Sequence, residues 1–318
     1  MIVDMHRHLW SVFERHPSAS HLFTRRFGSP GGQPVTLDAE GRAADVLAEM
    51  DEAGIGRTVI VVADFALRLG EGLFAIEEEN RLVAGLGRSN PGRILPFLGV
   101  DPRRPGSLEL FRRGLDEWGM AGLKLHPASG FFPYEPVCLP LFDLAGQRGV
   151  PVLVHTGPMV APFLSRMAQP VHLDEVAADF PKTTIIMAHV GLCWWEEALS
   201  IAWHKPNVVL ELSTWQWTFL RDPREFVRAV ATMKDSIGAE RIVFGSDFPA
   251  LRGAMSLRSW VEVFQKLPEL AQEHGYRISE TEAQAILGGN AERLLRLGDS
   301  AGRIRPLEGR RGAEAPTT

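Results

Sequence analysis

Cysteine is scarce in this chain of 318 residues, which carries only Cys138 and Cys193. Two thiols are too few for a disulfide framework, and their spacing is not that of a zinc ribbon. Small secreted domains held together by disulfides contain many more cysteines, so the scarcity indicates a reducing compartment. We therefore expect a soluble, cytoplasmic protein.

The chain also lacks an excess of positive charge and any long apolar run. Its net charge is −5 and its isoelectric point is near 6.1, so it has no basic character of the kind that binds nucleic acid or an anionic membrane. No run approaches the roughly 18 consecutive apolar residues of a membrane-spanning helix. The N-terminus has no basic region followed by an apolar one, as a signal peptide would. Nucleic acid and membrane are thus not expected as partners.

The remaining composition is the ordinary mixture of a globular protein. Hydrophobic residues make up 45% and charged residues 23% of the chain, values that exclude the disordered and fibrous classes. A mass of 35.2 kDa suits one large α/β domain or two small ones. Because no domain boundary is visible, we expect a single domain over residues 1–298.

Eight short runs rich in valine, isoleucine and leucine recur at fairly even intervals along the chain. Such runs are typical of strands that are buried on both faces, as in a parallel sheet. The expected strands are residues 2–8, 57–63, 93–100, 120–126, 150–156, 184–190, 206–213 and 241–247. The intervals between them leave room for one helix and two short loops each.

Helical periodicity fills these intervals. Residues 41–53 and 138–148 each place apolar side chains on one stripe and are followed by a glycine. Near the end of the chain, Ser279 and Glu282 have the spacing of a capping box, which predicts a helix running towards Leu297. Eight strand–helix units predict a distorted (β/α)8 barrel, a TIM barrel. An open, doubly wound α/β sheet is the alternative, but its glycine-rich turn after the first strand is missing.

Two segments depart from this alternation. Residues 10–37 form a long connection after the first strand, rich in serine, proline, glycine, histidine and arginine. A connection of this length is uncommon in a compact domain, and we expect it to act as a lid or substrate loop. Residues 299–318 have no periodicity and are rich in glycine, arginine, proline and alanine, so we expect a flexible C-terminal tail.

Histidines gather at the ends of the expected strands. Asp247 ends the eighth strand, and five of the ten histidines end strands one, four, five and six: His6, His8, His126, His155 and His189. In a barrel of this type, the loops that follow the strands build the active site at this face. Histidines used for packing would have no reason to gather there, so the pattern predicts an active site. The other five are expected at the surface or as capping groups: His16, His21, His172, His204 and His274.

His6 and His8 lie two residues apart on one strand, so both side chains point to the same side of the sheet. Two imidazoles so placed can bind one cation, although a pair of this kind also arises by chance. His155 on the fifth strand and Asp247 on the eighth extend the pair to three imidazoles and a carboxylate. This set predicts a site for zinc, or for another divalent ion such as manganese, iron or cobalt.

The strand ends also carry recognisable short motifs. They are Asp4-Met5-His6-Arg7-His8, Val154-His155-Thr156-Gly157, Met187-Ala188-His189-Val190-Gly191, Phe244-Gly245-Ser246-Asp247-Phe248-Pro249 and Gly289-Asn290-Ala291. Together they resemble the amidohydrolase superfamily over roughly residues 1–297, in the family's order. The closer resemblance is to its amidohydrolase-related branch, which includes aminocarboxymuconate semialdehyde decarboxylase, resorcylate decarboxylases and several ring-cleavage hydrolases. The motif set is specific for the superfamily but not for one reaction.

The resemblance implies a role for each strand-end residue. His6, His8, His155 and Asp247 would hold one metal ion, and His189 would lie beside it as an acid/base or polarising group. A second metal ligand, as in binuclear relatives, or a histidine of the core are the alternatives for His189. Asp247 is expected to have a second role, because a carboxylate in contact with an activated water can also accept its proton.

Lys124 on the fourth strand bears on the number of metal ions. Binuclear members of the superfamily carry on this strand a carbamylated lysine that bridges two metals, whereas the branch that the chain resembles is usually mononuclear. We therefore expect one metal. A lysine on the inner face of a barrel needs an anionic partner or a modification, so contact with a substrate carboxylate or an ion pair are the other interpretations. His126 shares strand parity with Lys124, and both are expected to contact substrate.

Further candidates for substrate contact lie in the loops. Arg25 and Arg26 in the long first loop could clamp a carboxylate bidentately, although loop arginines are commonly solvated. Aromatic residues near the strand ends, Trp215 among them, could form the wall of a substrate pocket or could equally pack within loops. They are Trp10, Phe65, Phe131, Phe132, Trp215 and Trp217.

Two reactions fit this set of residues. We expect a metal-dependent hydrolase of a small organic acid, lactone or amide, in which Asp247 receives the proton of an activated water and His189 stabilises the developing negative charge. The alternative is a metal-dependent non-oxidative decarboxylase, a lyase, acting on an aromatic or muconate-type carboxylic acid. It would require a cationic clamp, for which Lys124, Arg25 and Arg26 are the evident residues.

A role in binding alone is disfavoured, because packing does not select a complete ligand set together with an acid/base group. The expected partner is a small-molecule substrate. Barrels of this size often associate, so a homo-oligomer is also considered.

Overall fold

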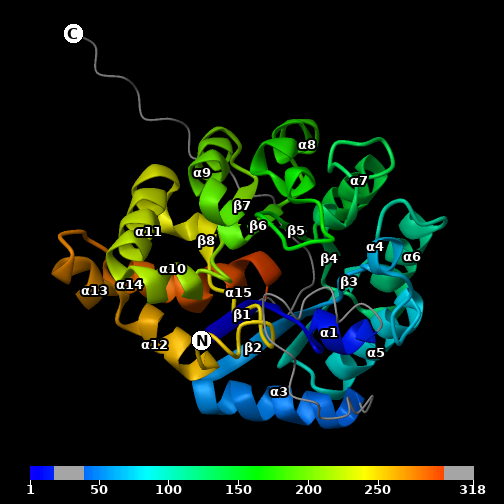
Figure 1. Cartoon of the computed structure of the whole chain (residues 1–318), viewed down its shortest axis with the longest axis horizontal. Coiled ribbons are helices and arrows are strands. Elements are labelled where there is room, and N and C mark those ends of the chain that lie inside the picture. The colour runs from blue at the N-terminus through cyan, green and yellow to red at the C-terminus, as the bar shows by residue number, and fades with distance from the viewer. Residues whose placement is uncertain (18–38, 297–318) are drawn as a thin grey trace.

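The computed structural model describes residues 1–17 and 39–296. They contain one sheet of eight parallel strands, whose spatial order is the order along the chain (Figure 1). The strands are β1 (Ile2–Arg7), β2 (Ile55–Val61), β3 (Ile94–Gly99), β4 (Gly122–Leu125), β5 (Val152–His155), β6 (Ile185–Ala188), β7 (Val208–Glu211) and β8 (Ile242–Val243). All eight expected strands are confirmed, although β8 is much shorter than expected.

The two ends of the sheet meet at β1 and β8, which makes the sheet a nearly closed barrel. The backbone N–H of Met5 donates to the carbonyl of Phe244 (3.1 Å), and the N–H of His8 donates to the carbonyl of Phe248 (2.7 Å). Arg7 also forms an isolated parallel bridge with Phe248. The TIM barrel is therefore confirmed, and the open doubly wound sheet is wrong.

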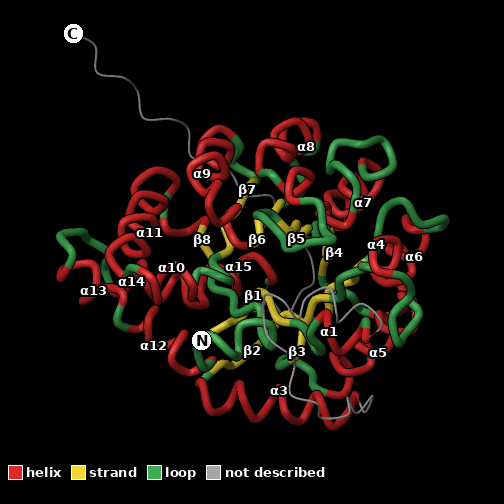
Figure 2. Tube along the Cα trace, in the orientation of Figure 1, coloured by secondary structure: helices red, strands yellow, loops and turns green. Residues whose placement is uncertain are grey.

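Helices surround the strands (Figure 2). They are α1 (Val12–Arg15), α3 (Ala39–Ala53), α4 (Ala66–Leu69), α5 (Ile76–Ser89), α6 (Ser107–Arg113), α7 (Leu139–Arg148), α8 (Asp174–Asp179), α9 (Trp195–His204), α10 (Gln216–Arg221), α11 (Pro223–Ile237), α12 (Leu257–Gln265), α13 (Leu267–Glu273), α14 (Glu280–Gln284) and α15 (Asn290–Leu295). The expected helices 41–53 and 138–148 are confirmed as α3 and α7. Each is followed by a glycine with positive φ, Gly54 at 71° and Gly149 at 61°, a conformation in which glycine is least strained.

The expected capping box begins the last helical segment. The Ser279 hydroxyl accepts from the backbone N–H of Glu282 (3.2 Å), and the Glu282 carboxylate accepts from the backbone N–H of Ser279 (2.8 Å). From α14 the chain continues through a π-helical turn, Ala285–Gly289, into α15. The expected helix towards residue 297 is thus confirmed to Leu295.

Two apolar layers hold the strands in place. Outward-facing strand residues pack against the helices, and inward-facing ones form a separate cluster inside the barrel. The inner cluster consists of Val3, Met5, Val59, Val61, Phe97, Leu153, Ile186, Ala188, Val209, Val243 and Ala291. Because Ala291 belongs to α15, that helix packs against the apolar cluster inside the barrel. The polar side chains of the site lie at the carboxyl ends of the strands.

Several expected features lie outside the described residues. Of the connection 10–37, only the part up to Pro17 is described, and it contains α1. Arg25, Arg26 and the expected tail 299–318 lie in the parts that are not described. Among the helices of residues 1–17 and 39–296, none has the length and apolar character needed to cross a membrane.

Candidate active site

Polar side chains from five strand ends line one cavity of about 110 Å³. They come from β1, β4 and β5 and from the segments that follow β6 and β8. They are His6, His8, Lys124, His126, His155, His189 and Asp247. The cavity thus lies at the end of the barrel where such enzymes build their sites, and it collects the strand-end residues that the sequence singled out.

His6, His8 and Asp247 form a tight group that could hold a cation, one of two such groups among the described residues. The Asp247 Oδ1 atom lies 3.3 Å from His8 Nε2 and 3.7 Å from His6 Nε2. One ligand atom from each of the three residues lies within 4.8 Å of the others. Two imidazoles and a carboxylate at this separation can share one divalent ion.

An irregularity in β1 directs both of these histidines inward. The register of β1 against β2 shifts between Asp4 and Arg7. As a result, Met5 packs in the inner cluster while its neighbour His6 reaches Lys124, also within the barrel. Irregularities of this kind re-aim side chains next to active sites.

Asp247 is held in a conformation that is unusual for a residue with a side chain. Its φ is 55°, and its backbone N–H donates to the carbonyl of His6 (2.7 Å). The preceding residue, Ser246, donates from its backbone N–H (2.9 Å) and its hydroxyl (2.6 Å) to the buried carboxylate of Asp4. Burial raises the pKa of Asp4 to about 6, and these hydrogen bonds oppose the rise. The loop that carries Asp247 is therefore fixed against β1.

His155 brings a third imidazole to the cavity. Its Nδ1 lies 3.1 Å from His189 Nε2, whereas its Nε2 is buried and has no hydrogen-bond partner among the described residues. His155 does not belong to the tight group of His6, His8 and Asp247. A buried nitrogen without a partner is costly, and a metal ion would supply the missing contact.

The electrostatics of the cavity suit metal binding. Burial lowers the pKa of His6, His126, His155 and His189 well below the usual value for histidine, and the positive charge of Lys124 adds to the effect. The imidazoles are therefore neutral, which is the form that binds a metal. The donor set thus fits a divalent ion that accepts nitrogen and oxygen ligands.

Lys124 lies fully buried against this donor set. Its Nζ is 3.3 Å from His6 Nε2. Burial lowers the pKa of Lys124 to about 8, and the carboxylates of Asp247 and Glu211 oppose the decrease. Lys124 therefore lies beside the expected cation site, where it can contact a bound anion.

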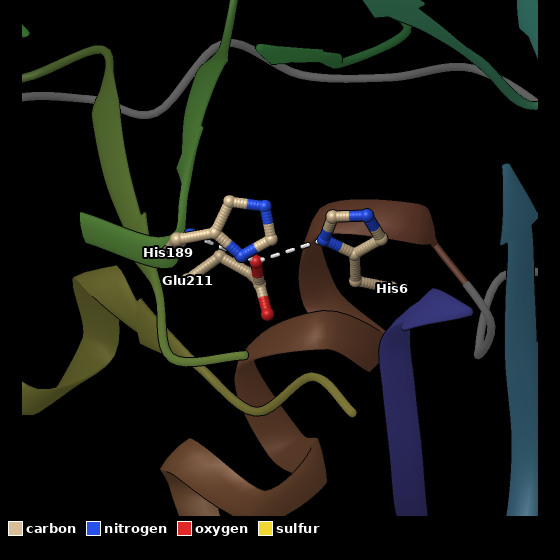
Figure 3. A group of neighbouring side chains, drawn as sticks. All are labelled: His6, His189 and Glu211. Atoms are coloured by element: carbon tan, nitrogen blue, oxygen red, sulfur yellow. Dashed lines mark hydrogen bonds and ion pairs between the residues drawn. The ribbon is translucent and has the colours of Figure 1, made fainter. Parts of the chain in front are cut away.

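Sequence reasoning missed Glu211 at the end of β7. Its side chain is completely buried, and Figure 3 shows its carboxylate between the rings of His6 and His189. The Oε2 atom lies 3.1 Å from His6 Nδ1 and accepts from the backbone N–H of His189 (3.2 Å). Burial raises the pKa of Glu211 to about 8. The only signal in the sequence was a carboxylate near the end of an otherwise apolar strand.

His6, His189 and Glu211 also lie close enough together to hold an ion, but a hydroxyl occupies the space between them. Ser213 Oγ lies 2.8 Å from Glu211 Oε2, 2.8 Å from His189 Nδ1 and 3.2 Å from His6 Nδ1. These contacts already satisfy the polar atoms of the group. We therefore interpret it as a hydrogen-bonded network behind the cation site.

His189 begins a turn with unusual backbone geometry. The φ angles of His189, Val190, Gly191 and Leu192 are 64°, 47°, 68° and 51°. Three of these residues carry side chains for which such values are unfavourable, so surrounding contacts must hold the turn. One contact is the hydroxyl of Thr156, which accepts from the backbone N–H of Gly191 (3.0 Å).

Trp215 provides a second contact to this turn and does not line the cavity. Its indole N–H donates to the carbonyl of His189 (2.8 Å), and its side chain is only 1% exposed. The expectation that Trp215 contacts substrate is therefore corrected: the side chain packs behind His189, against Trp195 and Phe226. The sequence contains no signal for this hydrogen bond between the Trp215 side chain and the main chain of His189.

The cavity is also lined by apolar side chains and one arginine, which we call its apolar wall. Its residues are Trp10, Val12, Phe65, Met159, Phe163 and Arg15. Of the aromatic candidates, Trp10 and Phe65 thus line the cavity, whereas Phe131, Phe132 and Trp217 do not. The guanidinium of Arg15 donates to the carbonyl of Ala63 (2.5 Å) and is paired with the buried carboxylate of Glu79.

Two further histidines complete the surroundings. His126 has its Nδ1 3.0 Å from the Ser129 hydroxyl, and its ring centroid lies 4.3 Å from that of His155. His16, expected at the surface or as a capping group, is the C-cap residue of α1 and is buried, with its ring 5.9 Å from that of Phe65. The surface position is therefore wrong, because α1 folds back onto the barrel.

Comparison with known proteins agrees with this architecture. The sequence profile described as amidohydrolase matches residues 3–297. No curated protein sequence gives a significant match.

Solved structures with the same fold cover nearly the whole chain. An uncharacterised TIM-barrel protein from Bordetella bronchiseptica is 25% identical, with a TM-score of 0.66, over 93% of this chain and 98% of that one. A 2,6-dihydroxybenzoate decarboxylase from Rhizobium is 17% identical, with a TM-score of 0.63, over 94% and 99%. An amidohydrolase from Burkholderia multivorans with bound zinc is 18% identical, with a TM-score of 0.66, over 93% and 99%.

Proposed function

The chain belongs to the amidohydrolase family and is an enzyme of that type, and we propose that it is a metal-dependent hydrolase of a small organic acid, lactone or amide. The observation that carries the proposal is the meeting of His6, His8 and Asp247 within one coordination sphere. His155, whose buried Nε2 has no hydrogen-bond partner within residues 1–17 and 39–296, lines the same cavity. Together these groups are a ligand set suited to one cation.

His6, His8, His155 and Asp247 would hold the metal, and we propose zinc as its identity. Three imidazoles and one carboxylate are ligands that zinc accepts readily, although manganese, iron and cobalt accept them too. The Burkholderia neighbour with bound zinc supports this choice. When bound, such an ion polarises a carbonyl group and makes a nearby water more acidic.

Asp247 is our candidate for the proton acceptor. Its carboxylate lies at the cation site with 14% of the side chain exposed, so a water in the cavity can reach it. In hydrolysis the oxygen of water bonds to the carbonyl carbon, Asp247 takes the proton, and the bond to the leaving oxygen, nitrogen or carbon breaks. Asp247 then returns the proton to the leaving group.

His189 has a more restricted part in this scheme. Both ring nitrogens are engaged, Nε2 with His155 (3.1 Å) and Nδ1 with the Ser213 hydroxyl (2.8 Å). His189 can reach a substrate only by exchanging its contact with His155 for one with the reacting oxygen. We therefore propose that its Nε2 relays the proton that Asp247 returns, while Lys124 stabilises the negative charge that develops on the reacting oxygen.

A non-oxidative decarboxylase is the second candidate, supported by cations at the cavity. Lys124 is buried there, and Arg15 lines the apolar wall. Either could contact the carboxylate of an aromatic acid, whose ring would pack against Phe65 and Phe163. The carbon–carbon bond to the carboxylate would break, and Asp247 or His189 would supply a proton to the ring carbon. The likeness in fold to a dihydroxybenzoate decarboxylase supports this alternative.

Metal content is the first test of the proposal. Protein purified without chelators should contain about one divalent ion per chain, measured by plasma mass spectrometry. His8→Ala should lose that ion, whereas His204→Ala, on the exposed face of α9, should retain it. Wild-type protein that neither contains nor takes up a stoichiometric divalent ion would contradict the proposal.

A substrate screen separates the two reactions. Lactones and amides would be assayed for release of titratable acid or amine, and aromatic carboxylic acids for release of carbon dioxide. Turnover confined to the first set would support the hydrolase. Turnover confined to the second would establish the decarboxylase.

We also propose a cytoplasmic location. Cys138 and Cys193 are both free thiols, as suits a reducing compartment. Cell fractionation should find the enzyme with cytoplasmic markers, and recovery in an oxidising compartment would contradict this proposal.

A further inference from the structure

The carboxylate of Glu211 makes hydrogen-bond contacts with more residues of the site than any other carboxylate described above. Its Oε2 accepts from the Ser213 hydroxyl (2.8 Å) and from the backbone N–H of His189 (3.2 Å), and lies 3.1 Å from His6 Nδ1. Its Oε1 accepts from the backbone N–H of Ser213 (2.7 Å). The two backbone N–H groups and the hydroxyl can only be satisfied here by an acceptor. These hydrogen bonds and the positive charge of Lys124 favour the carboxylate form of Glu211 and oppose the rise in its pKa that burial causes.

Gly245 leaves the space that Glu211 occupies. A Cβ atom at position 245 would lie 1.8 Å from Glu211 Oε1 and 3.1 Å from the Cβ of His6. Real atoms do not approach so closely, so any side chain at 245 would displace the carboxylate. The glycine next to Ser246 and Asp247 is thus required by a residue on the neighbouring strand β7.

The contacts of Glu211 determine which ring nitrogen of His6 carries the hydrogen. Since Glu211 Oε2 is an acceptor, the hydrogen of neutral His6 lies on Nδ1 and is donated to it. The lone pair of His6 then lies on Nε2. That atom is the one near Asp247 Oδ1 (3.7 Å) and Lys124 Nζ (3.3 Å), on the side of the expected cation.

The same reasoning continues through Ser213 to His155. The single hydroxyl hydrogen of Ser213 is donated to Glu211, so Ser213 Oγ accepts from His189 Nδ1. The lone pair of His189 is then on Nε2, which accepts from His155 Nδ1 (3.1 Å). His155 is left with its lone pair on Nε2, the buried nitrogen that has no partner among the described residues.

We propose that Glu211 is a positioning residue that sets the tautomers of His6 and, through Ser213 and His189, of His155. Both histidines then present Nε2 lone pairs to a divalent cation before it binds. This inference rests on the proposed function, since it assigns both nitrogens to the metal. Groups that hold metal-binding histidines in this way commonly contribute 10- to 100-fold to metal affinity.

The tautomers can be measured directly on the full-length, metal-free protein. Two-bond ¹H–¹⁵N spectra of histidine side chains distinguish Nδ1–H from Nε2–H, and single His→Gln variants assign the signals. We expect His6, His155 and His189 all to carry hydrogen on Nδ1. Glu211→Gln should shift His6 towards Nε2–H, because the amide nitrogen of glutamine presents donors where the carboxylate accepted. Ser213→Ala should leave His6 unchanged and give His155 a mixture of tautomers, which a merely structural role would not produce.

Metal affinity is the second measurement, with cobalt(II) alone as the probe. Competition with a chelator should show 10- to 100-fold weaker binding for Glu211→Gln and a smaller loss for Ser213→Ala, together with altered visible absorption of bound cobalt. Glu79→Gln is the matched control, because Glu79 is an equally buried carboxylate that pairs with Arg15. Its cobalt affinity should stay within about twofold of wild type. Should Glu211→Gln not fold, Ser213→Ala still tests the series of hydrogen bonds from Glu211 to His155.

The outcomes separate this inference from the proposed function. Wild-type protein with Nε2–H on His6 or His155, or a Glu211→Gln variant with unchanged tautomers and cobalt affinity, would overturn the inference. Wild-type protein that binds no divalent ion would overturn the proposed function and the metal part of the inference. The tautomer spectra would still decide whether Glu211 orders the three imidazoles.

Discussion

The barrel has a regular part and an irregular part, and the site draws different groups from each. We call residues 55–215, which include β2 to β7, the arc, and call residues 2–8 and 242–248, which include β1 and β8, the seam. Strand registers within the arc run without a shift. In the seam, β1 shifts register twice, β8 has two residues and Asp247 has a φ of 55°. The seam carries His6, His8 and Asp247, and the arc carries His155, His189 and Glu211.

This difference has a physical reason. A regular strand sends alternate side chains to one face at fixed spacing, which suits a hydrogen-bonded chain across neighbouring strands. Bringing two imidazoles and a carboxylate within a few ångströms requires a backbone that departs from that spacing. The irregular backbone of the seam allows this close approach, and the regular strands of the arc hold the seam in position. Each substitution below tests one side of this division.

The largest expected effect is from Asp247→Asn in the seam. Loss of the proposed ligand and proton acceptor should lower kcat by on the order of 10³-fold and strongly reduce the bound metal. His189→Asn in the arc should lower kcat by roughly 10²-fold and leave the metal bound. Kinetics and metal analysis of both variants provide the measurement. The surface variant Asp116→Asn is the control, and equal metal loss from the two site variants would contradict the division.

Gly245→Ala should show how tightly the seam and the arc are fitted. The new Cβ would lie 1.8 Å from Glu211 Oε1, so we expect a loss of about 3 kcal/mol in the free energy of unfolding, as for an overpacked core. In a Glu211→Ala background the same change should cost at least about 1 kcal/mol less. Urea unfolding of the four proteins gives the coupling. Additive effects would mean that Gly245 is not required by Glu211.

The pH dependence of stability should differ between Asp4 in the seam and the histidines of the arc. The arc histidines resist protonation when folded, so they make the protein less stable as pH falls below about 6.5, their unfolded value. Asp4 has the opposite sign. Its pKa is about 6 when folded, against 3.8 as the ordinary value, so the folded state binds the proton more tightly. Its contribution is lost as pH rises through this interval.

Asp4→Asn removes the Asp4 contribution. The gain in free energy of unfolding from pH 4 to pH 7 should therefore be larger in the variant than in wild type by about 2 kcal/mol. Urea unfolding of the metal-free proteins at several pH values provides the measurement. An unchanged pH profile would mean that Asp4 titrates in the folded protein as it does in the unfolded chain.

The smallest effect is expected for Trp215→Phe in the arc. The variant keeps most of the packing and removes the hydrogen bond to the carbonyl of His189, so the protein should lose about 1 kcal/mol of stability. The turn at His189 should loosen, with kcat about tenfold lower and KM little changed. Trp195→Phe is the matched control, because among the described residues the Trp195 indole forms no hydrogen bond to that turn, and the bond from the Trp195 backbone N–H to the carbonyl of Leu192 is kept in the variant. Similar kcat values for the two variants would show that the bond to His189 is unimportant.

Much of the barrel could be inferred from the pattern of residues along the chain. A strand buried on both faces must be apolar on both, which made all eight strands visible as short runs of valine, isoleucine and leucine. The spacing of His6 and His8 placed both on one side of their strand. The exception was β8, which stops at Val243 because the chain turns to bring Asp247 back to His6.

Other parts of the site left no such mark. Glu211 meets His6 across 205 positions of sequence, and nothing near either residue indicates their contact. Trp215 is an aromatic residue of the kind that lines substrate pockets, but its indole N–H donates a hydrogen bond to the backbone carbonyl of His189. His16 and Arg15 reach the barrel because α1 folds back on it, which depends on the buried partner Glu79.

Local chemistry was therefore enough to indicate which residues belong to strands, which strand ends carry histidines and a carboxylate, and that a ring of strands would bring these side chains together. Periodicity and residue type are properties of neighbours along the chain, and they survive without knowledge of the fold. The contact of Glu211 with His6, the close approach of Asp247 to His6 and His8, and the space kept by Gly245 are contacts between distant segments. Those depend on where the ring closes and how each side chain is packed, so they became visible only once the strands were assembled.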